Sequence, residues 1–291
     1  MENSETPTKN ASGSRVETIG RVAGDLKVTD IAPENLKDQV PVIILPGWGE
    51  TPATHKDSAE IVAKEGRRAI TFQVPRIGGA EKQDEHHQSE YNKARALIDT
   101  LNKKEIKQVD IIAHSEGALS AIIAAEIFAQ ERQPQRIRNI VFVEPVGLIG
   151  RDNLAKLVGR WGAMMTKDIG RFVKGSLKDK GNMARAFNEA NRYVVSNPIK
   201  TVSEARQISS SDIYDSLTHL RELGIQTSVI HAVDDSLFPM EKVMETVKEK
   251  GGMDTAGFYS VKGDHREISI HPEKYASLAV NALNDLAKQK T

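Results

Sequence analysis

One serine of the chain stands where its hydroxyl group could act as a nucleophile. Ser115 lies in the segment Ala113-His114-Ser115-Glu116-Gly117, after a short apolar run and before a long apolar helical pattern. A serine between a strand and a helix occupies a tight turn that exposes its hydroxyl, and this turn requires small residues two positions before and after it. Gly117 meets the requirement, and Ala113 meets it with a methyl group in place of the usual glycine. The setting predicts a nucleophile, with a helix N-cap serine as the alternative.

A nucleophilic hydroxyl needs a base, and the base needs a carboxylate that orients it. His265 follows a predicted strand and precedes the last predicted helix, so we expect it to be the base. Asp235 follows another predicted strand and lies four residues before Pro239, where a helix begins; we expect it to orient the histidine. Asp234, at the same strand end, and Glu144, at the end of a different strand, are the alternatives.

The negative charge that develops on a substrate carbonyl oxygen needs hydrogen-bond donors. One should be the backbone amide of Glu116, the residue after the serine. The second should come from Gly47-Trp48-Gly49, whose glycines let the backbone approach a ligand, and we expect the amide of Trp48. An ordinary turn is the alternative interpretation of this glycine pair. The side chain of Glu116 suits the first turn of its helix, so we expect it to point away from the oxyanion.

The other histidines have plainer interpretations, and no metal site is predicted. Adjacent histidines in a loop, such as His86 and His87, rarely converge on one ion, and no acidic cluster accompanies them. The chain has no cysteine, which excludes disulfides and thiolate chemistry. No cofactor is expected. We expect solvated or structural roles for the histidines other than His265: His55, His86, His87, His114, His219, His231 and His271.

These residues need a framework that brings distant loops to one place. Continuous apolar runs that do not alternate are typical of parallel strands covered by helices on both faces. Helical patterns lie between the runs, so the chain predicts an α/β fold with an open, mostly parallel central sheet. The predicted strands are 40–45, 109–113, 137–143, 227–233 and 257–261. The predicted helices outside the insertion described next are 58–65, 89–101, 116–130, 239–250 and 272–287.

One long stretch, 150–224, has helical patterns and no convincing strand. An insertion at this point would lie over the carboxyl ends of the parallel strands, where open α/β sheets bind ligands. We therefore predict a helical cap at 150–224 and a core formed by 16–149 and 225–291. Residues 1–15 are polar and are expected to be a disordered tail.

The first helix of this cap supplies candidate pocket residues. Trp161, Met164 and Met165 lie on its apolar stripe and would form an apolar roof. Gly47 is expected beside them, in the loop after the first apolar run. The alternative is that the stripe only packs on the core.

Composition limits the classes of partner. Forty basic and forty acidic residues cancel, and the basic residues form no long run, so nucleic acid is not expected. The N-terminal residues lack the apolar stretch of a signal peptide or membrane anchor, so we expect a cytoplasmic protein without membrane insertion. A basic face of the cap that rests on a membrane surface is the alternative. No pattern indicates an oligomeric state.

Four motifs together resemble the α/β-hydrolase superfamily, over a region from about Val40 to the C-terminus. The resemblance implies a serine hydrolase core with a helical cap, like that of the esterase and C–C-bond hydrolase branches. Serine at the nucleophile position differs from the aspartate of the dehalogenase and epoxide-hydrolase branches. The motifs are Pro46-Gly47-Trp48-Gly49, Ala113-His114-Ser115-Glu116-Gly117, His231-Ala232-Val233-Asp234-Asp235-Ser236-Leu237-Phe238-Pro239 and Gly263-Asp264-His265.

The expected activity is hydrolysis of a carboxylic ester or thioester through an acyl-enzyme on Ser115, as in esterases and lipases. The expected partner is a small-molecule ester or acyl substrate, and the apolar stripe of the cap favours a medium or long acyl chain. C–C bond hydrolysis and acyl transfer are alternatives on the same residues, because a fold does not choose its reaction. A ligand-binding protein with little turnover is a further alternative.

Overall fold

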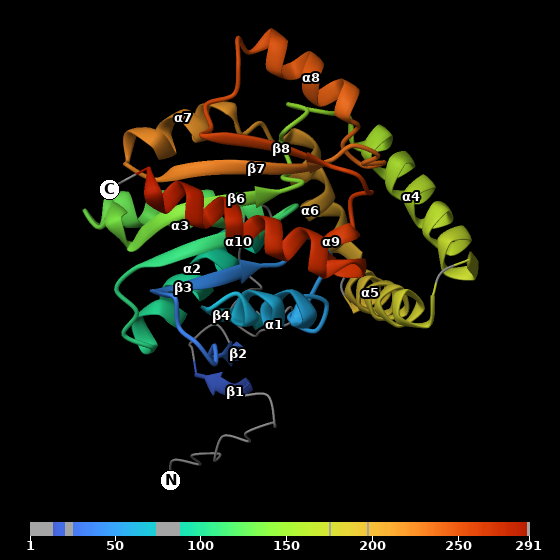
Figure 1. Ribbon diagram of the computed structural model, residues 1–291. Coiled ribbons are helices and arrows are strands. Elements are labelled where there is room, and N and C mark those ends of the chain that lie inside the picture. The colour runs from blue at the N-terminus through green and yellow to red at the C-terminus, as the bar shows by residue number, and fades with distance from the viewer. Residues whose placement is uncertain (1–13, 21–25, 74–87, 175, 197, 290–291) are drawn as a thin grey trace.

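The computed structural model describes most of the chain as one central sheet flanked by helices (Figure 1). Most of the predicted tail, residues 1–13, lies outside the described residues, whereas Ser14 and Arg15 already belong to the first strand. The described residues are 14–289, apart from 21–25, 74–87, 175 and 197.

The sheet has eight strands in the order β1-β2-β4-β3-β5-β6-β7-β8. The strands β3 to β8 run parallel to one another. At one edge of the sheet, β2 pairs antiparallel with β4, and β1 pairs antiparallel with β2. The strands are β1 (Ser14–Ile19), β2 (Leu26–Ile31), β3 (Asp38–Leu45), β4 (Arg67–Gln73), β5 (Val109–His114), β6 (Ile137–Val143), β7 (Gln226–Ala232) and β8 (Gly257–Val261).

Helices cover both faces of the sheet. One apolar core joins one face to α2, α3 and α7, and a second core joins the other face to α1 and α10. Every residue of β5 is buried, which explains its continuous apolar run. The helices of this part are α1 (Lys56–Lys64), α2 (Gln88–Lys103), α3 (Gly117–Gln130), the short 3-10 helix η2 (Pro134–Arg136), α7 (Tyr214–Glu222), α8 (Met240–Glu249), α9 (Glu267–Ile270) and α10 (Pro272–Lys288).

The predicted parallel strands are confirmed to within two residues, but three strands were not predicted. β1 and β2 lie at the edge of the sheet and mix exposed with buried positions, so neither forms a continuous apolar run. β4 begins with Arg67-Arg68, and this pair of charges conceals the apolar residues that follow. Arg67 is only 1% exposed, so its charge is buried within the fold.

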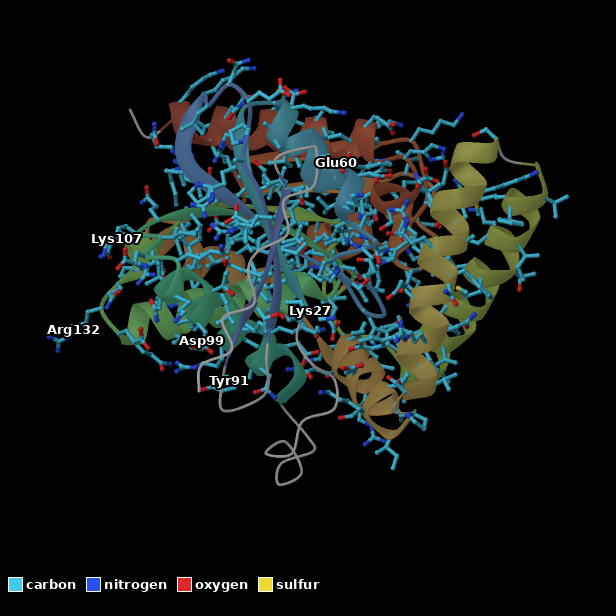
Figure 2. All side chains as sticks on the ribbon, turned by 90° about the horizontal axis from the view of Figure 1, so that it is seen from below. Lys27, Glu60, Tyr91, Asp99, Lys107 and Arg132 are labelled. Carbon is cyan, nitrogen blue, oxygen red and sulfur yellow. The ribbon has the colours of Figure 1, made fainter. Side chains whose placement is uncertain are left out.

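A buried ion network neutralises the charge of Arg67. The Arg67 guanidinium lies 2.6 Å from a carboxylate oxygen of Asp110, and the same oxygen is 2.6 Å from Arg138. Asp38 pairs with both arginines. These residues stand at the amino ends of β3 to β6. The loops that carry Lys107 and Arg132 lie at this end, away from the cap helices (Figure 2).

The predicted insertion forms three helices at the other end, α4 (Leu154–Lys174), α5 (Leu177–Ser196) and α6 (Pro198–Ser210), which pack on one another (Figure 1). We call these three helices the cap. The predicted boundary at 224 includes α7, but α7 contacts β7 and α3 and therefore packs with the sheet. None of the described helices is long and apolar enough to cross a membrane.

Candidate active site

Ser115 occupies a strained turn between β5 and α3. Its φ is 50°, in the left-handed region that residues other than glycine rarely adopt. The turn is fixed from a neighbouring strand, because the amide of Ser115 donates to the carbonyl of Val143 at 2.9 Å. Backbone strain of this kind persists only where the surrounding structure holds it, and it is common at functional sites.

Close packing explains the small residues around this turn. A Cβ atom on Gly117 would lie 2.6 Å from the carbonyl oxygen of Leu45, because α3 begins directly against the end of β3. A Cβ atom on Gly47 would lie 2.8 Å from the Cβ atom of Ser115. Ala113 is fully buried in the core beside α3, so its methyl group fits.

Three predicted residues from three distant loops meet at this turn. The Nε2 atom of His265 lies 2.9 Å from the Oγ atom of Ser115. The Nδ1 atom of the same ring lies 2.8 Å from an Oδ2 oxygen of Asp235. All three side chains are buried, at 5% exposure or less. Serine, imidazole and carboxylate thus form one hydrogen-bonded line.

The carboxylate of Asp235 is itself held in place. Its second oxygen accepts the amides of Leu237 at 2.7 Å and Phe238 at 2.8 Å. Of the two alternatives, Asp234 is exposed. Glu144 is buried and near His265, yet its carboxyl group contacts His114 at 3.2 Å instead. The contact with the His265 ring therefore belongs to Asp235.

The two predicted donor amides flank the serine. Trp48 is in the loop after β3, and Glu116 precedes the first residue of α3. Neither backbone amide donates to an acceptor within the part of the chain that the structure describes. Both are therefore available to an oxygen atom bound beside Ser115.

The side chain of Glu116 turns away from this space, as expected, and reaches α2. Its carboxyl group lies 2.7 Å from the Nζ atom of Lys93. Burial raises the pKa of Glu116 to about 8, with Lys93 lowering it and Glu90 raising it further. The residue after the serine thus offers its amide to the site and its side chain to a buried cluster.

A buried polar network behind the serine was not predicted. One oxygen of Glu50 lies 2.7 Å from each of three nitrogens: the amide of Gly47, Nε2 of His55 and Nδ1 of His114. Its other oxygen accepts the hydroxyl of Ser269 at 2.9 Å. His55 was predicted to have a solvated or structural role, and it is fully buried. The contacts of this network join positions 3 to 219 apart in sequence, so local patterns do not reveal the network as a whole.

Two groups in this region bring potential metal ligands together: Glu50, His55 and His114, and Glu144, Asp235 and His265. In the first group the facing atoms are 2.7 Å apart, the distance of a hydrogen bond. Ligands of a tetrahedral zinc ion at about 2.0 Å from the metal would stand roughly 3.3 Å apart. The geometry is therefore that of a hydrogen-bonded cluster. His86 and His87 lie outside the described residues.

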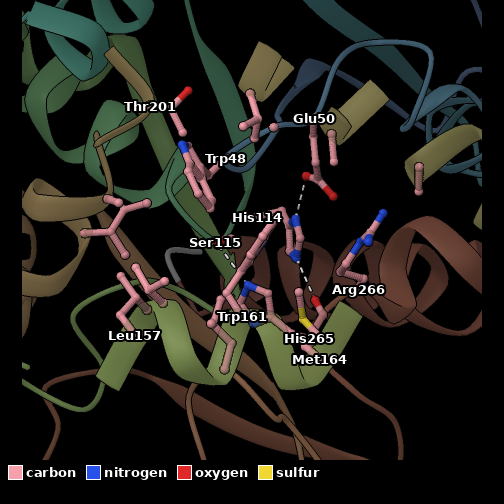
Figure 3. A pocket seen from close by; sticks show the side chains of 18 of the residues that line it. Trp48, Glu50, His114, Ser115, Leu157, Trp161, Met164, Thr201, His265 and Arg266 are labelled. Atoms are coloured by element: carbon pink, nitrogen blue, oxygen red, sulfur yellow. Dashed lines mark hydrogen bonds and ion pairs between the residues drawn. The ribbon is translucent and has the colours of Figure 1, made fainter. Parts of the chain in front are cut away.

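A cavity of about 210 Å³ opens above Ser115, between the core and the cap (Figure 3). Trp161 and Met164 line it as predicted. Gly47 and Met165 do not: Gly47 packs under Ser115, and the sulfur of Met165 contacts Arg266. Most of the remaining lining is aliphatic and comes from all three cap helices: Leu157, Val158, Ala186, Ala190, Val194, Val202, Ala205, Ile208 and, from the core, Leu237.

Two tryptophans join the core to the cap at this cavity. The rings of Trp48 and Trp161 meet edge to face with centroids 5.7 Å apart (Figure 3). The indole Nε1 of Trp48 donates to Glu204 of α6 at 3.0 Å, and the hydroxyl of Tyr193 donates to the same carboxylate at 2.7 Å. The loop that carries the amide of Trp48 is thus attached to two cap helices.

Ion pairs attach α4 to the loop of His265. Lys167 pairs with Asp264 at 2.6 Å, and Arg171 pairs with Glu267. Burial raises the pKa of Asp264, but Lys167 and the amides of Ser236 and His265 outweigh it and hold the pKa below its usual value. The cap therefore contacts both loops that flank the serine.

No protein-family profile matches the chain. Among curated proteins, one from Mycobacterium phage D29, provisionally named a non-heme haloperoxidase, is 26% identical over 259 residues, covering 84% of this chain and 88% of that protein. Among solved structures, a bromoperoxidase from Bacillus anthracis has a TM-score of 0.64 at 15% identity, covering 94% of this chain and 99% of its own. An esterase from Exiguobacterium antarcticum has a TM-score of 0.65 at 16% identity, covering 92% and 98%.

The strand order and these neighbours show that the chain has the α/β-hydrolase fold, as the four motifs predict. Sequence identities of 15 and 16% support a shared fold and do not identify an activity.

Proposed function

We propose that this protein is a serine hydrolase that cleaves a carboxylic ester or thioester through an acyl-enzyme on Ser115. The observation that carries the proposal is the line from Ser115 through His265 to Asp235, with contacts of 2.9 and 2.8 Å, at the floor of an apolar cavity. This arrangement of nucleophile, base and orienting carboxylate recurs on unrelated folds for acyl transfer.

In the proposed reaction, His265 takes the proton of Ser115 as the serine oxygen attacks the substrate carbonyl carbon. Asp235 stabilises the imidazolium that forms. The amides of Trp48 and Glu116 donate to the oxyanion, and each donor is worth about 3 kcal/mol in the transition state. His265 then protonates the leaving alcohol or thiol. A water molecule, deprotonated by the same histidine, releases the acid and restores Ser115.

The cavity supports an apolar acyl group as the part of the substrate that is recognised. Its walls are mostly aliphatic and aromatic, and Arg266, the one arginine or lysine that lines it within the described residues, already faces Asp168 at 3.3 Å. A charged acyl group would lose its hydration without gaining a free partner here. We therefore propose small-molecule esters with uncharged acyl chains as the substrate class.

Two measurements test the proposal. A fluorophosphonate probe should label the native protein on Ser115 and leave the Ser115→Ala protein unlabelled. Nitrophenyl esters from acetyl to dodecanoyl should be hydrolysed, with a preferred chain length that reports the size of the cavity. A native protein that is neither labelled nor active on any ester would overturn the proposal, and labelling without turnover would favour a ligand-binding role.

A second candidate is haloperoxidase activity, which the names of the phage relative and of the Bacillus structure suggest. In the same site, hydrogen peroxide in place of water would attack the acyl-enzyme and release a peroxy acid, which oxidises a halide ion and returns to the acid. Bromination of a dye in the presence of peroxide and a short-chain ester tests this reaction. It should disappear together with esterase activity in the Ser115→Ala protein.

A further inference from the structure

His114, next to Ser115, lies between acceptors on both sides of its ring. Its Nδ1 atom faces the Glu50 carboxylate at 2.7 Å. Its Nε2 atom faces the backbone carbonyl of His265 at 3.0 Å and Glu144 at 3.2 Å. A carbonyl oxygen can only accept a hydrogen bond, so Nε2 must carry a proton.

The proton on Nδ1 follows from the other partners of Glu50. The oxygen that faces His114 also accepts the amide of Gly47 and faces Nε2 of His55. Burial alone would raise the pKa of Glu50, but the two histidines hold it well below its usual value, so Glu50 is a carboxylate. A carboxylate oxygen accepts, and Nδ1 must donate. Both ring nitrogens of His114 therefore carry protons.

The charged groups around the ring support an imidazolium. Burial opposes the charge, but Glu50 and Glu144 outweigh it and raise the pKa of His114 to about 10. Burial, with Asp235 and Glu267 nearby, raises the pKa of Glu144 well above its usual value, which makes Glu50 the ionised partner. The titratable groups that face His114 from the surrounding loops are Glu50, His55, Glu144 and His265.

We propose that His114 is a positioning residue of the proposed hydrolase, a permanent imidazolium that holds the backbone of His265 in register with Ser115. It follows Ala113 on β5 and immediately precedes Ser115. Its ring therefore fixes the distance between the backbone at Ser115 and the carbonyl of His265. Through Glu50 the same ring is joined to Gly47 of the loop that carries the Trp48 amide. This proposal rests on the proposed function.

The test compares His114→Gln with two controls on either side of the ring. In His114→Gln, kcat/KM should fall about 10- to 100-fold through kcat, because a small misplacement of the base costs that much. The fall of kcat/KM as the pH rises through about 10, where the His114 ring loses a proton, should be absent in His114→Gln. Glu144→Gln and His55→Gln, which keep His114 and Glu50, should retain this alkaline limb.

A merely structural role would lower the activity of His114→Gln and leave the same alkaline limb in both proteins, and that result would overturn the proposal. Fluorophosphonate labelling at several pH values separates the two proposals. An unlabelled native protein refutes the hydrolase, whereas labelling with the same alkaline limb in native and His114→Gln proteins refutes only the role of His114.

A direct measurement on the native protein covers the case in which His114→Gln does not fold. Nitrogen NMR of protein labelled at its eight histidines should show one ring with both nitrogens protonated at pH 9. In Glu50→Gln that ring should lose a proton at lower pH, because its counter-ion is gone. A native spectrum at pH 9 without a doubly protonated ring would contradict the proposal.

Discussion

The loops at the carboxyl ends of the strands are built from polar contacts, whereas the face that the cap turns toward the cavity is built from apolar side chains. In the loops, buried polar side chains have several directional partners: Glu50 has four, and Asp235 has three. The cap contributes an apolar roof, and it leaves Val195 79% and Ile199 74% exposed. Hydrogen bonds fix positions closely, whereas apolar packing tolerates exchange of side chains of similar volume.

In the proposed hydrolase, this difference assigns separate tasks to the two regions. The loops hold the reacting groups against short, buried strands, so a change there alters the chemistry. The cap supplies most of the walls of the cavity, so a change there alters which substrate fits. The following predictions test that division, beginning with the largest expected effect.

The sharpest contrast within the loops is between two adjacent carboxylates. Asp235→Asn should lower kcat by about 10³- to 10⁴-fold, because the amide no longer stabilises the imidazolium or the required tautomer of His265. Asp234→Asn, at an exposed position, should stay within about twofold of the native kcat. Ester hydrolysis measures both. If Asp235→Asn keeps substantial activity, the double variant with Glu144→Gln shows whether Glu144 has taken over.

Substitution of two glycines compares the packing around the serine turn with the packing of the cap. Gly117→Ala should destabilise the protein by about 1–3 kcal/mol, since its Cβ would lie 2.6 Å from the carbonyl oxygen of Leu45. Gly162→Ala, on α4 with open space around it, should stabilise by about 0.5–1 kcal/mol through helix propensity. Denaturant unfolding gives both values. Equal effects of the two substitutions would contradict the proposed difference between closely packed loops and a cap that tolerates substitution.

The polar network of the loops should set an alkaline limit to stability. The pKa of His114 is raised from 6.5 to about 10 in the folded chain. A raised pKa contributes stability fully below the unfolded value and loses it as the pH rises through the folded value. The free energy of unfolding should therefore fall between pH 7 and 10.5 more in the native protein than in His114→Gln, by about 4 kcal/mol.

The cap offers a control for that measurement. Glu204→Gln changes a buried hydrogen-bond acceptor of α6 and leaves the Glu50 network intact. Its unfolding free energies should run parallel to those of the native protein across the same pH range. A His114→Gln curve that also runs parallel to the native one would argue against a raised pKa at His114.

The smallest effect is expected from the roof of the cavity. Trp161→Ala removes a wall and should raise KM for long-chain esters by about tenfold, while acetyl ester hydrolysis changes by less than about threefold. Phe172→Ala, on the same helix but lining a different cavity, is the matched control and should not change chain-length preference. A drop in kcat for all esters in Trp161→Ala would place part of the chemistry in the cap.

Much of the central sheet and the three residues of the hydrogen-bonded line could be predicted from the sequence. Buried parallel strands read as continuous apolar runs, and the turn at Ser115 requires residues that are visible within five positions. The chain order of Ser115, Asp235 and His265 then pointed to the loops that meet. Local sequence carried these signals because strand ends and turns are local features.

The polar contacts between loops could not be predicted in this way. A solvated or structural role was expected for His55, but the sequence does not reveal that its buried partner is Glu50. The charges of Arg67-Arg68 conceal β4 in the sequence, and Arg67 pairs with Asp110 on β5, two strands away in the sheet. The register of the sheet and the conformation of the loops bring the two members of each pair together.

The contact between Trp48 and Trp161 also makes the molecule its own optical reporter. The chain has two tryptophans, one in a core loop and one in the cap, with ring centroids 5.7 Å apart. Ultraviolet emission and exciton coupling between the indoles therefore originate at the seam over the serine. Displacement of the cap or entry of an acyl chain can be followed in solution by intrinsic fluorescence, without an attached dye.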